Sequence, residues 1–266
     1  MTDVLLATTE ADAAAATAIE QHHAQMAGAL AARVSALVAA ASGPDDAAQR
    51  AARESLVRWG RDELLPHAAA EERTLYPAAR DDARARLLID AMLTEHTEIS
   101  ALVDEIAAAQ GAVRAAAAGR ALEAMFASHL RKENELVLPL LTAAPGVSVA
   151  GLLGGMHELL GAQTDQPADQ PAQQAAEPAG HSCGCGGHDD PGFPVLDARA
   201  VPHAIRHATI FGALDAVPAG GGLVLLAPHD PLPLLAQIEQ RRPGVFAVGY
   251  LERGPETWRL SFTRAA

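Results

Sequence analysis

One pattern of three residue types occurs twice in the chain and restricts the fold more than any other feature. The segments HAAAEERTLYP, from His67 to Pro77, and HLRKENELVLP, from His129 to Pro139, both place Glu four residues after His and Pro ten residues after it. On a helix, residues i and i+4 lie on the same face. The repeat therefore predicts two helices that each present an imidazole and a carboxylate in the same direction.

The residues around this repeat predict a bundle of long helices. Ala, Leu, Glu and Arg dominate the first 160 residues, and segments that contain Pro or Gly separate the helical runs. Pro77 is expected to end the second run, and Asp81 and Asp82 are expected to cap the third. The expected helices are 9–41, 45–78, 82–110, 113–141 and a shorter one at 148–161. Four long antiparallel helices with short loops form an up-down four-helix bundle.

The two His–Glu pairs are expected to face the core of this bundle. His129 shares its stripe with Leu122, Phe126 and Leu136, which indicates an apolar and buried face. Buried carboxylates and imidazoles without a counter-charge are very costly. Because a pair of divalent cations removes that cost, the pattern indicates a metal centre.

The other two long helices each offer one histidine on the apolar face. His23 and His96 are both followed by large apolar residues three and seven positions later. His22 lies one residue round the helix and fits the stripe less well, so it is the alternative to His23. Imidazole together with carboxylate inside a bundle suits two iron ions, or manganese, better than structural zinc. The predicted metal ligands are His23, His67, Glu71, His96, His129 and Glu133.

These residues carry a resemblance to a known family. Residues 10–145 resemble the hemerythrin-like (HHE cation-binding) family, whose four-helix bundle holds an oxygen-bridged, non-haem di-iron site. Oxygen-carrying hemerythrins have a second histidine where this chain has Ser100, and their last motif is His-x4-Asp where this chain has His-x3-Glu. Both differences make the chain more similar to iron–sulfur-cluster-repair proteins and other bacterial HHE domains. The resemblance implies a protein that binds or senses O2, NO or redox state, with an extra open position on one iron.

Two other functions are compatible with the same residues. One is a di-iron enzyme or iron donor in nitrosative or oxidative stress defence, acting in iron–sulfur cluster repair or in NO or peroxide reduction. The other is an interaction protein whose bundle stores or buffers metal. Turnover of NO or peroxide by the reduced protein would distinguish an enzyme from a ligand-binding protein.

The composition changes after the bundle, which predicts a two-domain chain. Residues 1–162 form the predicted hemerythrin-like domain, 163–194 a flexible linker rich in Gln, Pro and Ala, and 195–266 a small second domain. The linker contains HSCGCGGH, whose thiols and imidazoles suit a soft metal ion or are incidental residues of a disordered tether. The residues of this possible second metal site are His181, Cys183, Cys185 and His188.

The last segment alternates strand and helix patterns in the order βαβαββ, which describes a small two-layer α/β domain. The pieces LDAR, RHATIFGALDAV, HDP and GPETWRL give residues 194–264 a resemblance to the domain of unknown function 2249 family. That family is similar in turn to small sulfur carriers of the TusA/SirA type, and His203 stands where those proteins present a cysteine. The domain is expected to serve as an output or interaction module that binds a protein partner.

Three histidines of this domain fall at the carboxyl ends of strands or in the turns that follow. His203, His207 and His229 therefore lie where open α/β sheets bind ligands, and they form a candidate second site. The alternative is that His229 and Asp230 simply cap the second helix of the domain.

Charge and hydropathy exclude several classes of partner. The net charge is −13 and neither half of the chain is basic, so nucleic acid and anionic membrane are not expected partners.

The apolar stretches are diluted with Ala and broken by charges, and the N-terminal segment carries acids without Lys or Arg. Neither a membrane span nor a signal peptide is predicted, and the expected location is the cytoplasm. Two Cys so close together cannot form a disulfide scaffold.

Overall fold

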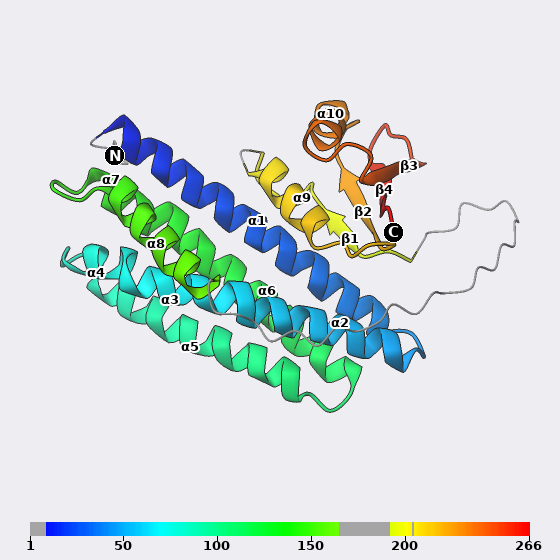
Figure 1. The fold of residues 1–266 in the computed structure, drawn as a ribbon, viewed down its shortest axis with the longest axis horizontal. Coiled ribbons are helices and arrows are strands. Elements are labelled where there is room, and N and C mark those ends of the chain that lie inside the picture. Colours follow the sequence, from blue (N-terminus) through cyan, green and yellow to red (C-terminus); the bar gives the residue numbers. More distant parts are fainter. Residues whose placement is uncertain (1–8, 165–191, 204) are drawn as a thin grey trace, which may run out of the picture.

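A computed structural model describes residues 9–164, 192–203 and 205–266 of the chain. It contains a bundle of long helices followed by a small α/β domain (Figure 1). Both parts agree with the fold class that the sequence predicts.

Four long helical rods make up the bundle, and two of them are interrupted. The first rod is α1 (Glu10–Ala41), and the third is α5 (Arg86–Ala108). The second consists of α2 (Asp46–Trp59), a π turn η1 (Gly60–Leu64), α3 (Leu65–Arg73) and α4 (Leu75–Arg80). The fourth consists of α6 (Ala112–Lys132), a π turn η2 (Glu133–Val137) and α7 (Leu138–Ala143), and α8 (Val149–Thr164) then packs on the bundle.

Two expected helix boundaries are wrong. Pro77 does not end the second rod, because the chain breaks at Thr74 and Pro77 then falls in the first turn of α4, where proline is tolerated. The third rod begins at Arg86 rather than near residue 82, and no side chain caps it. Asp82 instead accepts a hydrogen bond from the backbone N–H of Arg84, which holds a turn before α5.

Both π turns lie in the rods that carry a His–Glu pair, and each is followed by a proline. Pro66 and Pro139 stand two residues after η1 and η2, so in each case the carbonyl that the proline ring displaces lies within the π turn. The extra residue in the turn rotates the following side chains. Leu136, expected in the core, is 51% exposed, whereas Val137 is buried.

The apolar core of the bundle is divided into two layers. One layer contains Met26, Ile99 and Phe126, and the other contains Ile19 and Met92. In sequence, the histidines and glutamates of the predicted metal centre fall between these two sets of residues. The core therefore leaves a polar level across the middle of the bundle.

The C-terminal domain is a four-stranded sheet with two helices. Its elements are β1 (Val195–Asp197), α9 (Arg206–Asp215), β2 (Gly222–Ala227), α10 (Leu232–Arg241), β3 (Phe246–Glu252) and β4 (Trp258–Arg264). The strand order is β1-β2-β4-β3, with β1 parallel to β2 and β4 antiparallel to both of its neighbours. Right-handed crossovers in this order place α9 and α10 on the same face of the sheet. The order βαβαββ is confirmed.

Helix α9 joins the two domains, because it packs on the sheet with one face and on α1 with the other (Figure 1). The two helices approach through glycines. A Cβ atom on Gly28 would lie 1.9 Å from the carbonyl oxygen of Thr209, and one on Gly212 would lie 1.9 Å from that of Gln25. Only residues without a side chain permit this contact.

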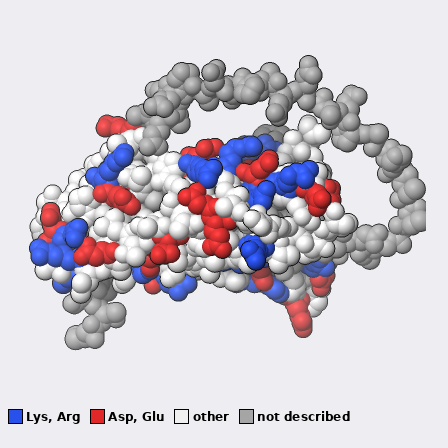
Figure 2. Space-filling view, turned by 90° about the horizontal axis from the view of Figure 1, so that it is seen from below, with Lys and Arg blue, Asp and Glu red and all other residues white. Residues whose placement is uncertain are grey.

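Helix α1 is, within the described residues, the one helix long and apolar enough to span a membrane by length and composition. Its most apolar window has a mean hydropathy of 1.4 and is 44% buried inside the protein. Packing of its small residues against α6 and α9 accounts for this apolar character. On the face shown in Figure 2, Lys and Arg side chains are interspersed with Asp and Glu rather than gathered into a basic patch.

Candidate metal centre

The six predicted ligands come together in one buried cluster. Each is 6% exposed or less, and His23 is fully buried. They come from α1, α3, α5, α6 and the first residue of η2, so all four rods contribute. His22, the alternative in the first rod, is exposed and lies at the edge of the cluster.

Glu71 lies at the centre of this cluster. Its Oε1 atom is 2.9 Å from Nε2 of His67 and 3.2 Å from Nε2 of His23, and its Oε2 atom is 3.5 Å from Nε2 of His96. Two groups of three residues have all their ligand atoms within 4.8 Å of one another, and Glu71 belongs to both. The groups are His23, His67 and Glu71, and Glu71, His96 and His129. Each group could hold a metal ion, and Glu71 is the residue that the two groups share.

Glu133 provides a second carboxylate between the two groups. Its Oε2 atom is 3.7 Å from Nε2 of both His23 and His129, and its Oε1 atom accepts a hydrogen bond of 2.7 Å from the hydroxyl of Tyr76. Within the described part of the chain, Glu133 Oε2 and Nδ1 of His67 are buried without a hydrogen-bond partner, and Nε2 of His67, although 2.9 Å from Oε1 of Glu71, is not aligned for a hydrogen bond. Buried atoms of this kind are normally satisfied, so lone pairs left in the cluster fit a set of metal ligands.

The protonation of the cluster also fits a set of metal ligands, because its two buried carboxylates lack enough positive charge to balance them. Burial and the charge on Glu71 raise the pKa of Glu133 to about 8. Although burial opposes it, hydrogen bonding to Glu71 and the charge of Glu133 raise the pKa of His23 to about 9. Burial and the charge on His96 lower the pKa of His129 to about 4. The protein alone therefore keeps a proton on one carboxylate, and cations would replace that proton.

Three of the four histidines are held from behind by a side chain on another rod. Nδ1 of His96 donates to Glu72 at 2.8 Å, Nδ1 of His129 donates to Glu95 at 3.0 Å, and Nδ1 of His23 donates to Asn134 at 2.7 Å. A donor at Nδ1 leaves Nε2 with its lone pair directed into the cluster, as in the carboxylate–histidine–metal arrangement.

The sequence patterns did not identify these supporting residues, although their positions carried a signal. Glu72, Glu95 and Asn134 each stand beside a cluster residue in the sequence. In each adjacent pair, one side chain enters the cluster and the other supports a histidine from the next rod. His22 and His23 extend this arrangement around the bundle, because the ring of His22 lies 5.0 Å from the ring of His67, centroid to centroid.

Tyr76 was also missed as a residue of the site. Its side chain is 2% exposed, and its hydroxyl lies 3.3 Å from Nε2 of His96 and 3.2 Å from Nε2 of His129. Burial and the charges of Glu133 and Glu71 raise the pKa of Tyr76, so the hydroxyl keeps its proton. The residue stands in the first motif, one position before Pro77, and this place in the motif was the available signal.

Ser100 lies outside the cluster. It lines an outer groove of about 510 Å³ together with His96 and Glu72. The groove gives solvent a route to the side of His96 that carries Nδ1 and faces Glu72, whereas Tyr76 lies beside Nε2 on the side that faces the cluster.

Two further predicted sites are not part of this cluster. His203, His207 and His229 lie in the C-terminal domain, away from the bundle core. His181, Cys183, Cys185 and His188 lie outside the described residues.

Removing a supporting side chain should weaken metal binding without emptying the cluster of ligands. Asn134→Leu keeps the approximate volume but removes the acceptor for Nδ1 of His23, and we expect metal affinity to fall about 10–100-fold. Asn134→Asp, which still accepts, is the matched control and should bind nearly normally. Competitive titration with a chromophoric chelator measures the difference. Equal affinities for the two variants would contradict the supporting role.

Comparison with protein families agrees with the geometry of both domains. Residues 14–141 match the hemerythrin HHE cation binding domain, and residues 195–264 match DUF2249, described as an uncharacterized conserved protein. No curated protein and no solved structure matched the chain. The buried His–Glu cluster and the family matches together show that the chain joins an N-terminal hemerythrin HHE cation-binding domain to a C-terminal DUF2249 domain.

Proposed function

We propose that the bundle is a non-haem di-iron centre that binds or senses a small diatomic ligand, O2 or NO. The observation that carries this proposal is the position of Glu71, whose carboxylate belongs to two adjacent groups of buried ligand atoms. One ion would be held by His23 and His67, and the other by His96 and His129. Glu71 and Glu133 would supply the carboxylate ligands. Manganese is the alternative metal.

When bound, the metal would supply reversible binding of a diatomic ligand and redox chemistry. The protein supplies the other requirements. Apolar layers on both sides of the cluster limit access of water, and the supporting residues orient the imidazoles. The hydroxyl of Tyr76 donates its proton to Oε1 of Glu133, which fixes that carboxylate beside His96 and His129.

The test is metal content followed by spectroscopy of the full chain. Protein loaded anaerobically with ferrous iron should retain about two ions per chain after gel filtration, as expected for a shared-carboxylate centre. Addition of O2 should produce near-ultraviolet absorption, and addition of NO to the reduced protein should give a different spectrum. Retention of zinc but not of iron or manganese would contradict the proposal.

An enzyme or an iron donor is the second candidate, and the groove that reaches His96 favours it because it offers a route for exchange. Steady consumption of NO or peroxide by the reduced protein would support an enzyme. Transfer of iron to a chelating acceptor, without consumption of NO or peroxide, would support a donor or a metal buffer.

We also propose that the protein is located in the cytoplasm and that its DUF2249 domain binds a protein partner.

A further inference from the structure

The C-terminal domain contains a cavity that is separate from the metal centre. It has a volume of about 240 Å³ and lies at the carboxyl ends of the parallel strands β1 and β2, where Ala198 and Ala227 line it. Ligands of open α/β sheets bind at this edge. This volume is below the roughly 300–1,000 Å³ of pockets that hold drug-sized ligands, so the cavity suits a molecule smaller than a nucleotide.

The floor of the cavity is apolar. Ile210 from α9, Leu225 from β2 and Leu234 from α10 line it, and each is 2% exposed or less. These side chains already pack in the core of the domain, so the floor is rigid and has no polar group to satisfy. A ligand for this cavity therefore has an apolar body.

The rim is cationic or neutral. His203, Arg206, His207 and His229 line the opening, and none of the described residues that line the cavity is Asp or Glu. The nearby carboxylates are engaged elsewhere, since Asp230 accepts a hydrogen bond of 2.9 Å from Tyr250 and Asp197 pairs with Arg199. The ring nitrogens of the three histidines do not form a group as tight as those in the bundle, which disfavours a metal ion.

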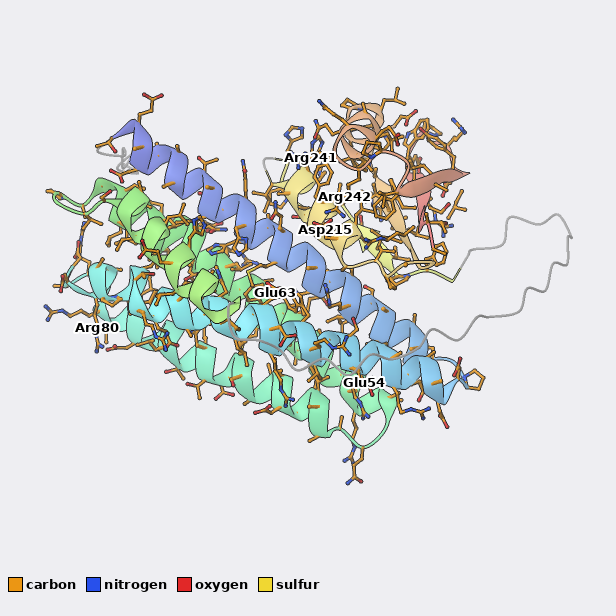
Figure 3. The ribbon with its side chains drawn as sticks, in the orientation of Figure 1. Glu54, Glu63, Arg80, Asp215, Arg241 and Arg242 are labelled. Carbon is orange, nitrogen blue, oxygen red and sulfur yellow. The ribbon has the colours of Figure 1, made fainter. Side chains whose placement is uncertain are left out.

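Two helices begin at the same rim, and neither has a side-chain cap. The N-cap residues are Ile205 for α9 and Pro231 for α10, so the interpretation of His229 and Asp230 as a helix cap is wrong. Uncapped N-termini favour negative charge. The other ends of the two helices are tied together by the ion pair of Asp215 with Arg242 (Figure 3).

We propose that this cavity binds a small organic anion, with an apolar body on the floor and a carboxylate at the rim. Arg206 contributes charge while two of its nitrogens donate to the carbonyl of Val201, which fixes the guanidinium in place. His203 and His229 are exposed, and each offers an imidazole to the carboxylate. The site is independent of metal in the bundle.

The experiment is calorimetric titration of the full chain with benzoate, and with benzyl alcohol and inorganic phosphate as probes of each half of the ligand. We expect benzoate to bind at least about ten-fold more tightly than either probe. Benzyl alcohol lacks the carboxylate that accepts charge-assisted hydrogen bonds, and phosphate lacks the apolar body that contacts the floor. Benzyl alcohol equal to benzoate would show an apolar cavity only and overturn the proposal. Phosphate equal to benzoate would show an anion site without an apolar body and would overturn it as well.

Variants locate the binding. His203→Ala combined with His229→Ala changes two exposed side chains, and it should weaken benzoate binding about ten-fold. His157→Ala, an exposed histidine on α8, is the control and should have no effect. Ala227→Leu fills the cavity and should abolish binding. Unchanged affinity in the double variant, or absence of benzoate binding to the parent protein, would overturn the assignment.

Discussion

Replacement of Glu71 by glutamine is expected to abolish tight binding of the two metal ions that we propose for the cluster. The carboxylate lies within 3.5 Å of ring nitrogens from His23, His67 and His96, and it is the member common to both groups of ligand atoms. An amide keeps the shape but not the negative charge or the ability to bridge. We expect affinity to fall by more than about 100-fold, which exceeds the effect of losing a supporting residue.

Thermal unfolding makes this loss measurable without any assay of activity. Metal at a thousand times its dissociation constant stabilises the folded state by about 4 kcal/mol, which corresponds to roughly 10 °C in a domain of this size. That increase should disappear in Glu71→Gln. Glu54→Gln changes an exposed residue of α2 (Figure 3) and should keep the full increase. A metal-dependent increase of the same size in both variants would refute the central position of Glu71.

Replacement of Gly28 by alanine is expected to separate the C-terminal domain from the bundle. The new Cβ would lie 1.9 Å from the carbonyl oxygen of Thr209. Both the methyl group and this oxygen are attached to helix backbone, so neither can move aside without a shift of its helix. The interface of α1 with the C-terminal domain must open, and it includes, besides the contact with α9, the hydrogen bond of 3.3 Å from Ser35 to the carbonyl of Val195 in β1. Hydrogen exchange in α9 should rise, and the radius of gyration should increase.

The matched control is Gly154→Ala, because a Cβ at that position of α8 meets nothing within 4 Å. Alanine in place of a helical glycine favours the helix by about 1 kcal/mol, so the control should be slightly more stable than the parent. Metal content should stay normal in both variants, since no ligand is touched. Unchanged exchange in α9 of the Gly28→Ala protein would show that the glycine contact does not hold the domains together.

Local periodicity predicted much of the fold because helices and strands bury repeating faces. The bundle, the order βαβαββ and the inward direction of His67 with Glu71 follow from spacing alone. The π turns did not, since the pattern around Pro66 and Pro139 is compatible with a simple kink. Leu136 was misplaced for this reason: one extra residue in η2 turns it to solvent.

The sequence by itself determined which side chains a metal centre could use, because a His–Glu pair four residues apart on an apolar face needs a counter-charge when that face is buried. Only the tertiary structure decided how these side chains are held. Glu72, Glu95 and Asn134 act on histidines of other rods, and such pairings depend on how the rods are rotated and aligned. The contact of Gly28 with α9 was equally invisible, since a glycine in an Ala-rich helix shows no preference for a neighbour until two backbones meet.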